Sequence, residues 1–208
     1  MIYSKKILVA CECSGRVRDA FSQRGHNAWS CDLKPSERVG KHLQMDVFEA
    51  IKLDDWDMMI AFPECTYMTA SGIHWNGRIE GREELTEESL QFVQRLMDAP
   101  IRQIAIENPV GIISSRIREP DQTIQPYEFG EDASKRTCLW LKNLPRLKKT
   151  YRCPGRLVEY PPQSGELVER WSNQTDSGQN KLPPSETRAE ERSRTYWGIA
   201  LAMANQWV

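Results

Sequence analysis

Short apolar runs and amphipathic segments alternate along this chain. Each run is rich in Ile, Val, Ala or Met and is bounded by charged residues or by proline, which is typical of buried strands. The predicted strands lie at residues 5–12, 26–33, 56–62 and 101–109, with a shorter one ending around Asp46.

Three other segments have the spacing of helices, namely 14–25, 86–99 and 193–208. In the last of them Ile199, Met203 and Trp207 repeat every four residues, so we expect a terminal helix that packs on the core. Because strands alternate with helices, the predicted fold class is α/β, a Rossmann-like, doubly wound and mostly parallel sheet covered on both faces.

The composition is that of a soluble globular protein. With 208 residues, 39% apolar and 27% charged, and a net charge of −1, the chain predicts one main domain and shows no overall bias toward nucleic acid. Its apolar runs are too short for a signal peptide or for a membrane span of roughly 18 residues, so we expect a cytoplasmic protein. The six cysteines lack paired C-x-x-C spacing and the three histidines stand apart, so we expect free thiols and no metal.

The stretch from Thr150 to about Arg192 differs from the rest of the chain. It holds five of the twelve prolines and little apolar periodicity, which is typical of a long loop, a small irregular subdomain or partial disorder. We therefore divide the chain into a core at 1–149, a short irregular insert at 150–191 and a terminal helix at 192–208 that packs back on the core.

Small and acidic residues follow the first three predicted strands, where an open α/β sheet binds its ligand. They are Cys11, Glu12, Ser14 and Gly15 after the first strand, Asp32 after the second and Asp46 after the third. The small residues would bring backbone close to a ligand and leave helix N–H groups free, and the carboxylates could bind a nucleoside. Phosphate-binding glycine motifs are absent, so a nucleoside without phosphates fits better than NAD or ATP. Turn formation or helix capping is the alternative for both aspartates.

The apolar run DMMIAF ends at Pro63, and Cys65 follows two positions later. A thiolate is a strong nucleophile, and a loop just past a parallel strand can hold it beside its target. An inert buried thiol is the alternative. The next strand ends in Glu107 and Asn108, and this carboxylate could hydrogen-bond a base, cap a helix or form an ion pair.

Residues 135–156 contain eight Lys or Arg and no acidic residue, with Trp140 and Tyr151 interleaved. This composition favours a surface that tracks phosphates and stacks on bases. A solvated basic loop has the same composition and stays open as the alternative.

Taken in order, these segments resemble the DNA cytosine-5 methyltransferases, and in particular short, phage-type forms. VACECSG stands at the family's S-adenosylmethionine loop, CDL and QMD at its ribose and adenine contacts, and FPECTYMTASG at its nucleophile loop. ENP stands at the Glu-Asn motif, SKRT at a reduced Arg-rich motif and RTYWGIALAMANQW at the closing motif. The resemblance covers about residues 5 to 145 and 192 to 208.

The resemblance implies methyl transfer from S-adenosylmethionine to carbon 5 of cytosine in DNA. The cofactor would be held by Phe62 and by the residues that follow the first three predicted strands, namely Cys11, Glu12, Ser14, Gly15, Asp32 and Asp46. Cys65 would attack carbon 6 of the base, Glu107 would hold or protonate the ring nitrogen, and Arg136 would bind the base oxygen or nearby backbone. The DNA, a duplex with a flipped cytosine or a single strand, would be contacted by Pro63, Asn108, Lys135, Lys148 and Lys149.

The chain departs from the family pattern at three places. Glu12 and Ser14 replace glycines, Glu64 replaces the proline before the nucleophile, and the insert is too short for an ordinary target-recognition domain. The short insert predicts a short recognition context. Three alternatives remain: the same chemistry on RNA or a nucleotide, a non-catalytic relative that binds DNA or cofactor, and an amino methyltransferase, whose Asp-Pro-Pro-Tyr type loop FPEC does not match.

Overall fold

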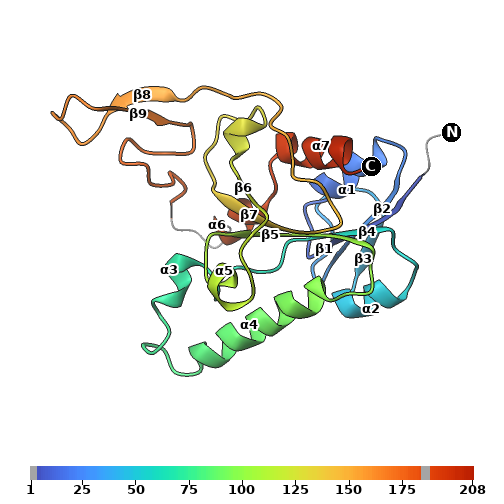
Figure 1. Cartoon of the computed structure of the whole chain (residues 1–208). Coiled ribbons are helices and arrows are strands. Elements are labelled where there is room, and N and C mark those ends of the chain that lie inside the picture. Colours follow the sequence, from blue (N-terminus) through green and yellow to red (C-terminus); the bar gives the residue numbers. More distant parts are fainter. Residues whose placement is uncertain (1–3, 184–187) are drawn as a thin grey trace.

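The computed structural model describes residues 4–183 and 188–208, and helices cover both faces of a seven-stranded sheet (Figure 1). The strands of this sheet are β1 (Lys6–Ala10), β2 (Asn27–Asp32), β3 (His42–Gln44), β4 (Met58–Ala61), β5 (Gln103–Pro109), β6 (Gln122–Ile124) and β7 (Thr137–Lys142). The helices are α1 (Arg16–Ser22), α2 (Val47–Lys52), α3 (Ala70–Ile73), α4 (Arg82–Met97), α5 (Ile113–Arg116), the 3-10 helix η1 (Pro126–Glu128), α6 (Arg188–Ser193) and α7 (Trp197–Gln206).

The strand order is β3-β2-β1-β4-β5-β7-β6. Strands β1 to β5 pair in parallel, whereas β7 runs antiparallel to both β5 and β6. The chain builds outward from β1 to β3, then returns to place β4 on the other side of β1, so the order reverses between β1 and β4. The predicted class, a doubly wound and mostly parallel α/β sheet, is confirmed.

Alternation of side chains along the strands creates two apolar cores, one on each face of the sheet. In β1, Ile7 and Val9 face the core shared with α1 and α7, while Leu8 and Ala10 face the core shared with α2 and α4. The predicted terminal helix is confirmed as α7, since Ile199, Met203 and Trp207 are all buried. Among the described residues, no helix is long and apolar enough to cross a membrane.

Strand β7 corrects the interpretation of residues 135–156 as one exposed basic surface. The strand lies between β5 and β6, where Thr137 to Trp140 are buried. Trp140 was predicted to stack on bases, but it is only 1% exposed, and its indole N–H donates to the carbonyl of Arg118 at 2.7 Å. The periodicity of this short strand was hidden by the lysines and arginines on either side of it.

The predicted irregular insert contains a hairpin of β8 (Arg156–Glu159) and β9 (Leu167–Arg170), which projects from the body of the molecule (Figure 1). Trp171, just after the hairpin, stacks on Tyr127 with ring centroids 4.0 Å apart. The insert is therefore anchored to the core at its base. Residues 184–187 of the insert lie outside the described residues.

We expect Trp140→Phe to lower the free energy of unfolding by about 0.5–1.5 kcal/mol, because it removes the donor of a partly buried hydrogen bond. DNA affinity of the folded variant should be unchanged, since the ring is not on the surface. Denaturant unfolding and a DNA-binding titration measure the two effects. Tyr151→Phe, at an exposed side chain, is the control and should change stability by less than about 0.5 kcal/mol. Weakened DNA binding by folded Trp140→Phe would contradict this placement.

Candidate active site

The strand order reverses between β1 and β4, and in such sheets a ligand usually binds beyond the carboxyl ends of the strands at this point. Phe62 follows β4, and its N–H donates to the carbonyl of Ala10 at the end of β1. Burial raises the pKa of the Cys11 thiol, and the nearby carboxylates of Asp32 and Asp46 raise it further. The predicted residues Cys11, Asp32, Asp46 and Phe62 are thus brought to one end of the sheet.

The loop after β1 corrects the expectation of free helix N–H groups. Glu12 is buried, and its carboxylate accepts hydrogen bonds from the N–H groups of Val17 and Arg18 in α1, at 2.9 and 3.4 Å, and from the Ser14 hydroxyl at 2.9 Å. Burial raises the pKa of Glu12, while these hydrogen bonds and the Arg18 cation oppose the rise. Glu12 therefore occupies the position at which a helix would bind a phosphate. Both Glu12 and Ser14 bond within the loop.

Gly15 begins α1 in the left-handed conformation, with φ of 69°. A Cβ at this position would lie 2.5 Å from the buried guanidinium of Arg18. That guanidinium bonds the hydroxyl groups of Ser30 and Ser36, so it holds the segment after β2 against α1. Because Gly15 has no side chain, Arg18 can pack here and hold the segment after β2 next to the loop after β1.

Both aspartates adopt the capping roles that the sequence left open. Asp32 accepts from the N–H of Lys34 at 2.9 Å, and Asp46 caps α2 by accepting from the N–H of Phe48 at 2.8 Å. A carboxylate has about four acceptor positions, so these bonds leave capacity for a ligand. Neither bond decides between a structural and a ligand-binding role.

The loop that carries Cys65 is held by its own turn. The carbonyl of Cys65 accepts from the N–H groups of Met68 and Thr69 at 3.0 and 3.1 Å. The guanidinium of Arg82 then donates to the carbonyls of Thr66 and Gly72. This turn leaves Cys65 half-buried at the end of β4.

The segment after β5 is joined to this loop. Asn108 is buried, and its side-chain amide donates to the carbonyl of Pro63 at 2.8 Å. The carbonyl of Met68 accepts from the N–H of Ile112 at 2.9 Å, and a Cβ on Gly111 would lie 2.0 Å from that same carbonyl oxygen. Only glycine permits this approach, so the loop that carries Cys65 and the loop that follows β5 form one unit.

Three charged side chains act on the predicted nucleophile, Cys65. Burial raises the pKa of Cys65 and the Glu107 carboxylate raises it further, whereas the cations of Lys135 and Arg192 lower it. The ammonium of Lys135 lies 3.9 Å from a carboxylate oxygen of Glu107, and both side chains are largely buried. The structure thus brings together Cys65, Glu107 and Lys135, with Arg192 nearby.

Arg136, the predicted catalytic cation, is not part of this group. It is exposed, and strand alternation puts it in phase with Cys138, which faces the α4 side of the sheet. Glu107 pairs instead with Leu139, which faces the α1 and α7 side. The side chains of Glu107 and Arg136 therefore belong to opposite sides of the sheet.

The predicted DNA contacts divide into three groups. Pro63 and Asn108 are buried and fix the nucleophile loop. Lys148 is exposed beside Gln206 in the last turn of α7, and Lys149 forms an ion pair with Glu128 at 2.7 Å. Only Lys135 lies at the candidate site.

Sequence reasoning missed two residues that help shape this site. Arg82 lies outside the predicted helix at 86–99, although α4 begins at this residue, and the sequence pattern identifies Arg192 only as the boundary of the insert. No periodicity identifies either side chain as a neighbour of the Cys65 loop. Both become neighbours through tertiary packing.

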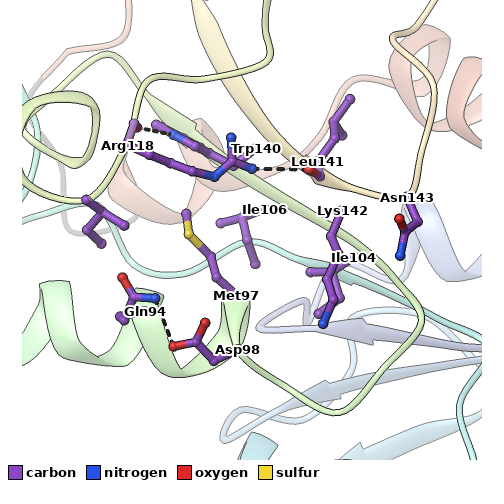
Figure 2. Close-up of a pocket in the computed structure, with 11 residues that line it drawn as sticks. Gln94, Met97, Asp98, Ile104, Ile106, Arg118, Trp140, Leu141, Lys142 and Asn143 are labelled. Carbon is purple, nitrogen blue, oxygen red and sulfur yellow. Dashed lines mark hydrogen bonds between the residues drawn. The ribbon is translucent and has the colours of Figure 1, made fainter.

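A cavity of about 690 Å³ lies elsewhere, between α4 and the β5–β7 part of the sheet (Figure 2). Its floor includes Ile104, Ile106 and Trp140, and the side chains of Gln94 and Asp98 at its rim hydrogen-bond each other. Cys65, Glu107 and Asn108 do not line it. We assign it no part in the candidate site.

Neither a protein-family model nor a curated protein matches the sequence. Among solved structures, one similar fold is that of an E. coli protein encoded within a prophage and described as a suspected DNA modification methyltransferase. It shares 13% identity with this chain over 66% of this chain and 46% of its own, with a TM-score of 0.42. The chain therefore spans less than half of that protein. This likeness does not assign a function.

Asn108→Ala should lower the free energy of unfolding by about 1–3 kcal/mol, because the buried carbonyl of Pro63 loses its donor. The amides of Met68 and Thr69 should also exchange with solvent faster, since the loop is freed from β5. Hydrogen exchange resolved by peptide measures this. Gln94→Ala, in an exposed pair on α4, should leave that exchange unchanged. Equal protection in wild type and Asn108→Ala would contradict the coupling of the two loops.

Proposed function

We propose that this protein transfers a methyl group from S-adenosylmethionine to carbon 5 of cytosine in DNA through a transient adduct on Cys65. The observation that carries the proposal is the pairing of a thiol and a carboxylate at adjacent strand ends. Cys65 follows β4, Glu107 lies near the end of its parallel neighbour β5, and a buried hydrogen bond from Asn108 joins β5 to the loop that carries Cys65. In this reaction a nucleophile adds to the base while an acidic group compensates the charge that develops on the ring. Both groups must therefore lie within the span of a single base.

The residues at the carboxyl ends of β1, β2 and β3 suit the proposed cofactor. Glu12 already occupies the N–H groups of α1, so a phosphate would meet a buried carboxylate there. A phosphate-free nucleoside that carries a positive charge suits such an acidic end of the sheet, and Asp32 and Asp46 retain free acceptor positions for its hydroxyl and amino groups. When bound, S-adenosylmethionine supplies an electrophilic methyl group.

The roles of the protein's own residues follow from their positions. The thiol of Cys65 loses its proton and its sulfur forms a bond to carbon 6 of cytosine, which makes carbon 5 electron-rich. Glu107 holds or protonates the ring nitrogen, so that charge does not accumulate on the base. After carbon 5 has gained the methyl group and lost its proton, the sulfur–carbon bond breaks and Cys65 leaves. Arg136 stays assigned to the DNA backbone near the base.

DNA is the proposed partner, either as a duplex with a flipped cytosine or as a single strand. Flipping costs a few kcal/mol, so a mismatched or unpaired cytosine should react more readily. Apart from the start of α6, the β8–β9 hairpin is the only regular element in the described part of the insert, which favours a short recognition context. RNA or a free nucleotide is the second candidate substrate for the same site.

The test is incubation with labelled S-adenosylmethionine and, in separate reactions, duplex DNA, single-stranded DNA, RNA and a cytidine nucleotide, followed by identification of the modified nucleoside. We expect label in 5-methyldeoxycytidine. Cys65→Ala should abolish transfer, and Glu107→Gln should lower it strongly but less completely, because the amide keeps part of the hydrogen bonding.

Cys138→Ala is the matched control, since it removes a thiol from a neighbouring strand, and it should retain activity. Label on an exocyclic nitrogen, or full activity of Cys65→Ala, would contradict the proposal. Label only in RNA or in the nucleotide would keep the chemistry and replace the substrate.

A further inference from the structure

The pairing between β5 and β7 determines which basic residue faces the candidate site. Glu107 lies opposite Leu139 and Pro109 lies opposite Thr137. Directly opposed residues share a face and alternate residues return to it, so continuing β7 backward by two residues reaches Lys135 on the Glu107 side. The 3.9 Å approach of its ammonium to Glu107 agrees with this register.

The main chain at Lys135 is fixed from two directions. Its N–H donates to the side-chain carbonyl of Gln125 at 3.0 Å, and its carbonyl accepts from the Thr137 hydroxyl at 3.1 Å. The preceding residue, Ser134, is bonded through both its N–H and its carbonyl to the side-chain amide of Asn173, each at 2.9 Å. Because its backbone is held in this way, the side chain of Lys135 starts from a fixed position.

We propose that Lys135, and not Arg136, is the cation that balances charge at the Cys65–Glu107 pair and faces the carbonyl oxygen of the bound base. In the free protein it acts on both partners as a positioning residue. The inference rests on the proposed function for the identity of the base, but its effect on Cys65 does not require a substrate.

A cytosine held by Glu107 through its ring nitrogen carries its carbonyl oxygen on the adjacent ring atom. The ammonium of Lys135 lies beside the same carboxylate, within the reach needed to donate to that oxygen. When sulfur adds to carbon 6, negative charge develops on the ring nitrogen and this oxygen, and a fixed cation there stabilises it. Arg136 is exposed and by strand alternation is in phase with Cys138 rather than with Leu139, the partner of Glu107, so it has no comparable position.

The groups that act on the thiol come from three elements. Glu107 on β5 disfavours the thiolate, while Lys135 before β7 and Arg192 on α6 favour it. Because the thiolate is the reactive form, the rate of alkylation rises with pH as Cys65 ionises. Removal of Lys135 raises the pKa of Cys65 and moves this rise to higher pH, whereas neutralising Glu107 moves it to lower pH.

The experiment measures alkylation of Cys65 by iodoacetamide against pH in the purified protein, without DNA or cofactor, by peptide-resolved mass spectrometry. At a fixed pH below the midpoint, Lys135→Met should slow alkylation about threefold. Lys135→Arg should restore the rate, because it returns the cation, and Glu107→Gln should increase it. Arg136→Met is the matched control and should leave the profile in place.

Circular dichroism confirms that each variant is folded, and Lys135→Gln serves if the Met variant is not. An unchanged profile in folded Lys135→Met, or a shift caused by Arg136→Met instead, would overturn the inference. Because no methyl transfer is measured, that outcome leaves the proposed function intact. Absence of methyl transfer with the predicted alkylation shifts would overturn the proposed function alone.

Discussion

The account depends on the buried hydrogen bond from the Asn108 side chain to the carbonyl of Pro63. Parallel pairing of β4 and β5 places two loop starts side by side, but loops on a sheet edge can diverge after the last paired residue. This bond, together with the contact between Met68 and Ile112, prevents the divergence. The Cys65 loop is therefore held against the end of β5, where the Glu107 carboxylate acts on the thiol. The side-chain oxygen of Asn108 is also buried, and among the described residues no donor reaches it. Placing Asn108 here therefore costs free energy of folding.

The charged side chains near these loops differ between the proposed cofactor site and the proposed base site. Carboxylates cluster where the cofactor is proposed to lie, with Glu12 in place of a phosphate. At the base site a carboxylate and two cations oppose each other around a half-buried thiol. Such a thiol is held mostly in its protonated form until a substrate alters the balance, which limits unproductive reactions of the nucleophile. The basic residues of the 135–156 run are largely engaged elsewhere, as the ion pairs of Lys149, Arg152 and Arg156 show.

Much of the sheet could be predicted from the sequence, because β1, β2, β4 and β5 are short apolar runs bounded by charge or proline. β6 and β7 could not, since β6 is only three residues long and the lysines around β7 concealed its alternation. Cys65 and Glu107 could be found because each lies at or just past the carboxyl end of a predicted strand. The choice between Lys135 and Arg136 could not be made, because it depends on the register of an antiparallel pair that local patterns do not reveal. Glu12 as a helix cap was missed for a similar reason, since its partners lie in the following helix and depend on the loop's turn.

The central claim is that Cys65 adds to carbon 6 of a cytosine. A cytosine that carries fluorine at carbon 5 tests it directly, because the adduct cannot lose fluorine as it would lose a proton and so cannot release the cysteine. DNA containing this base, incubated with the protein and S-adenosylmethionine and then denatured, should yield a covalent complex. Mass spectrometry of its peptides should place the base on Cys65, and Cys65→Ala should give no complex. Methylation at carbon 5 of ordinary cytosine without any trapped complex, or a complex at another residue, would contradict the account.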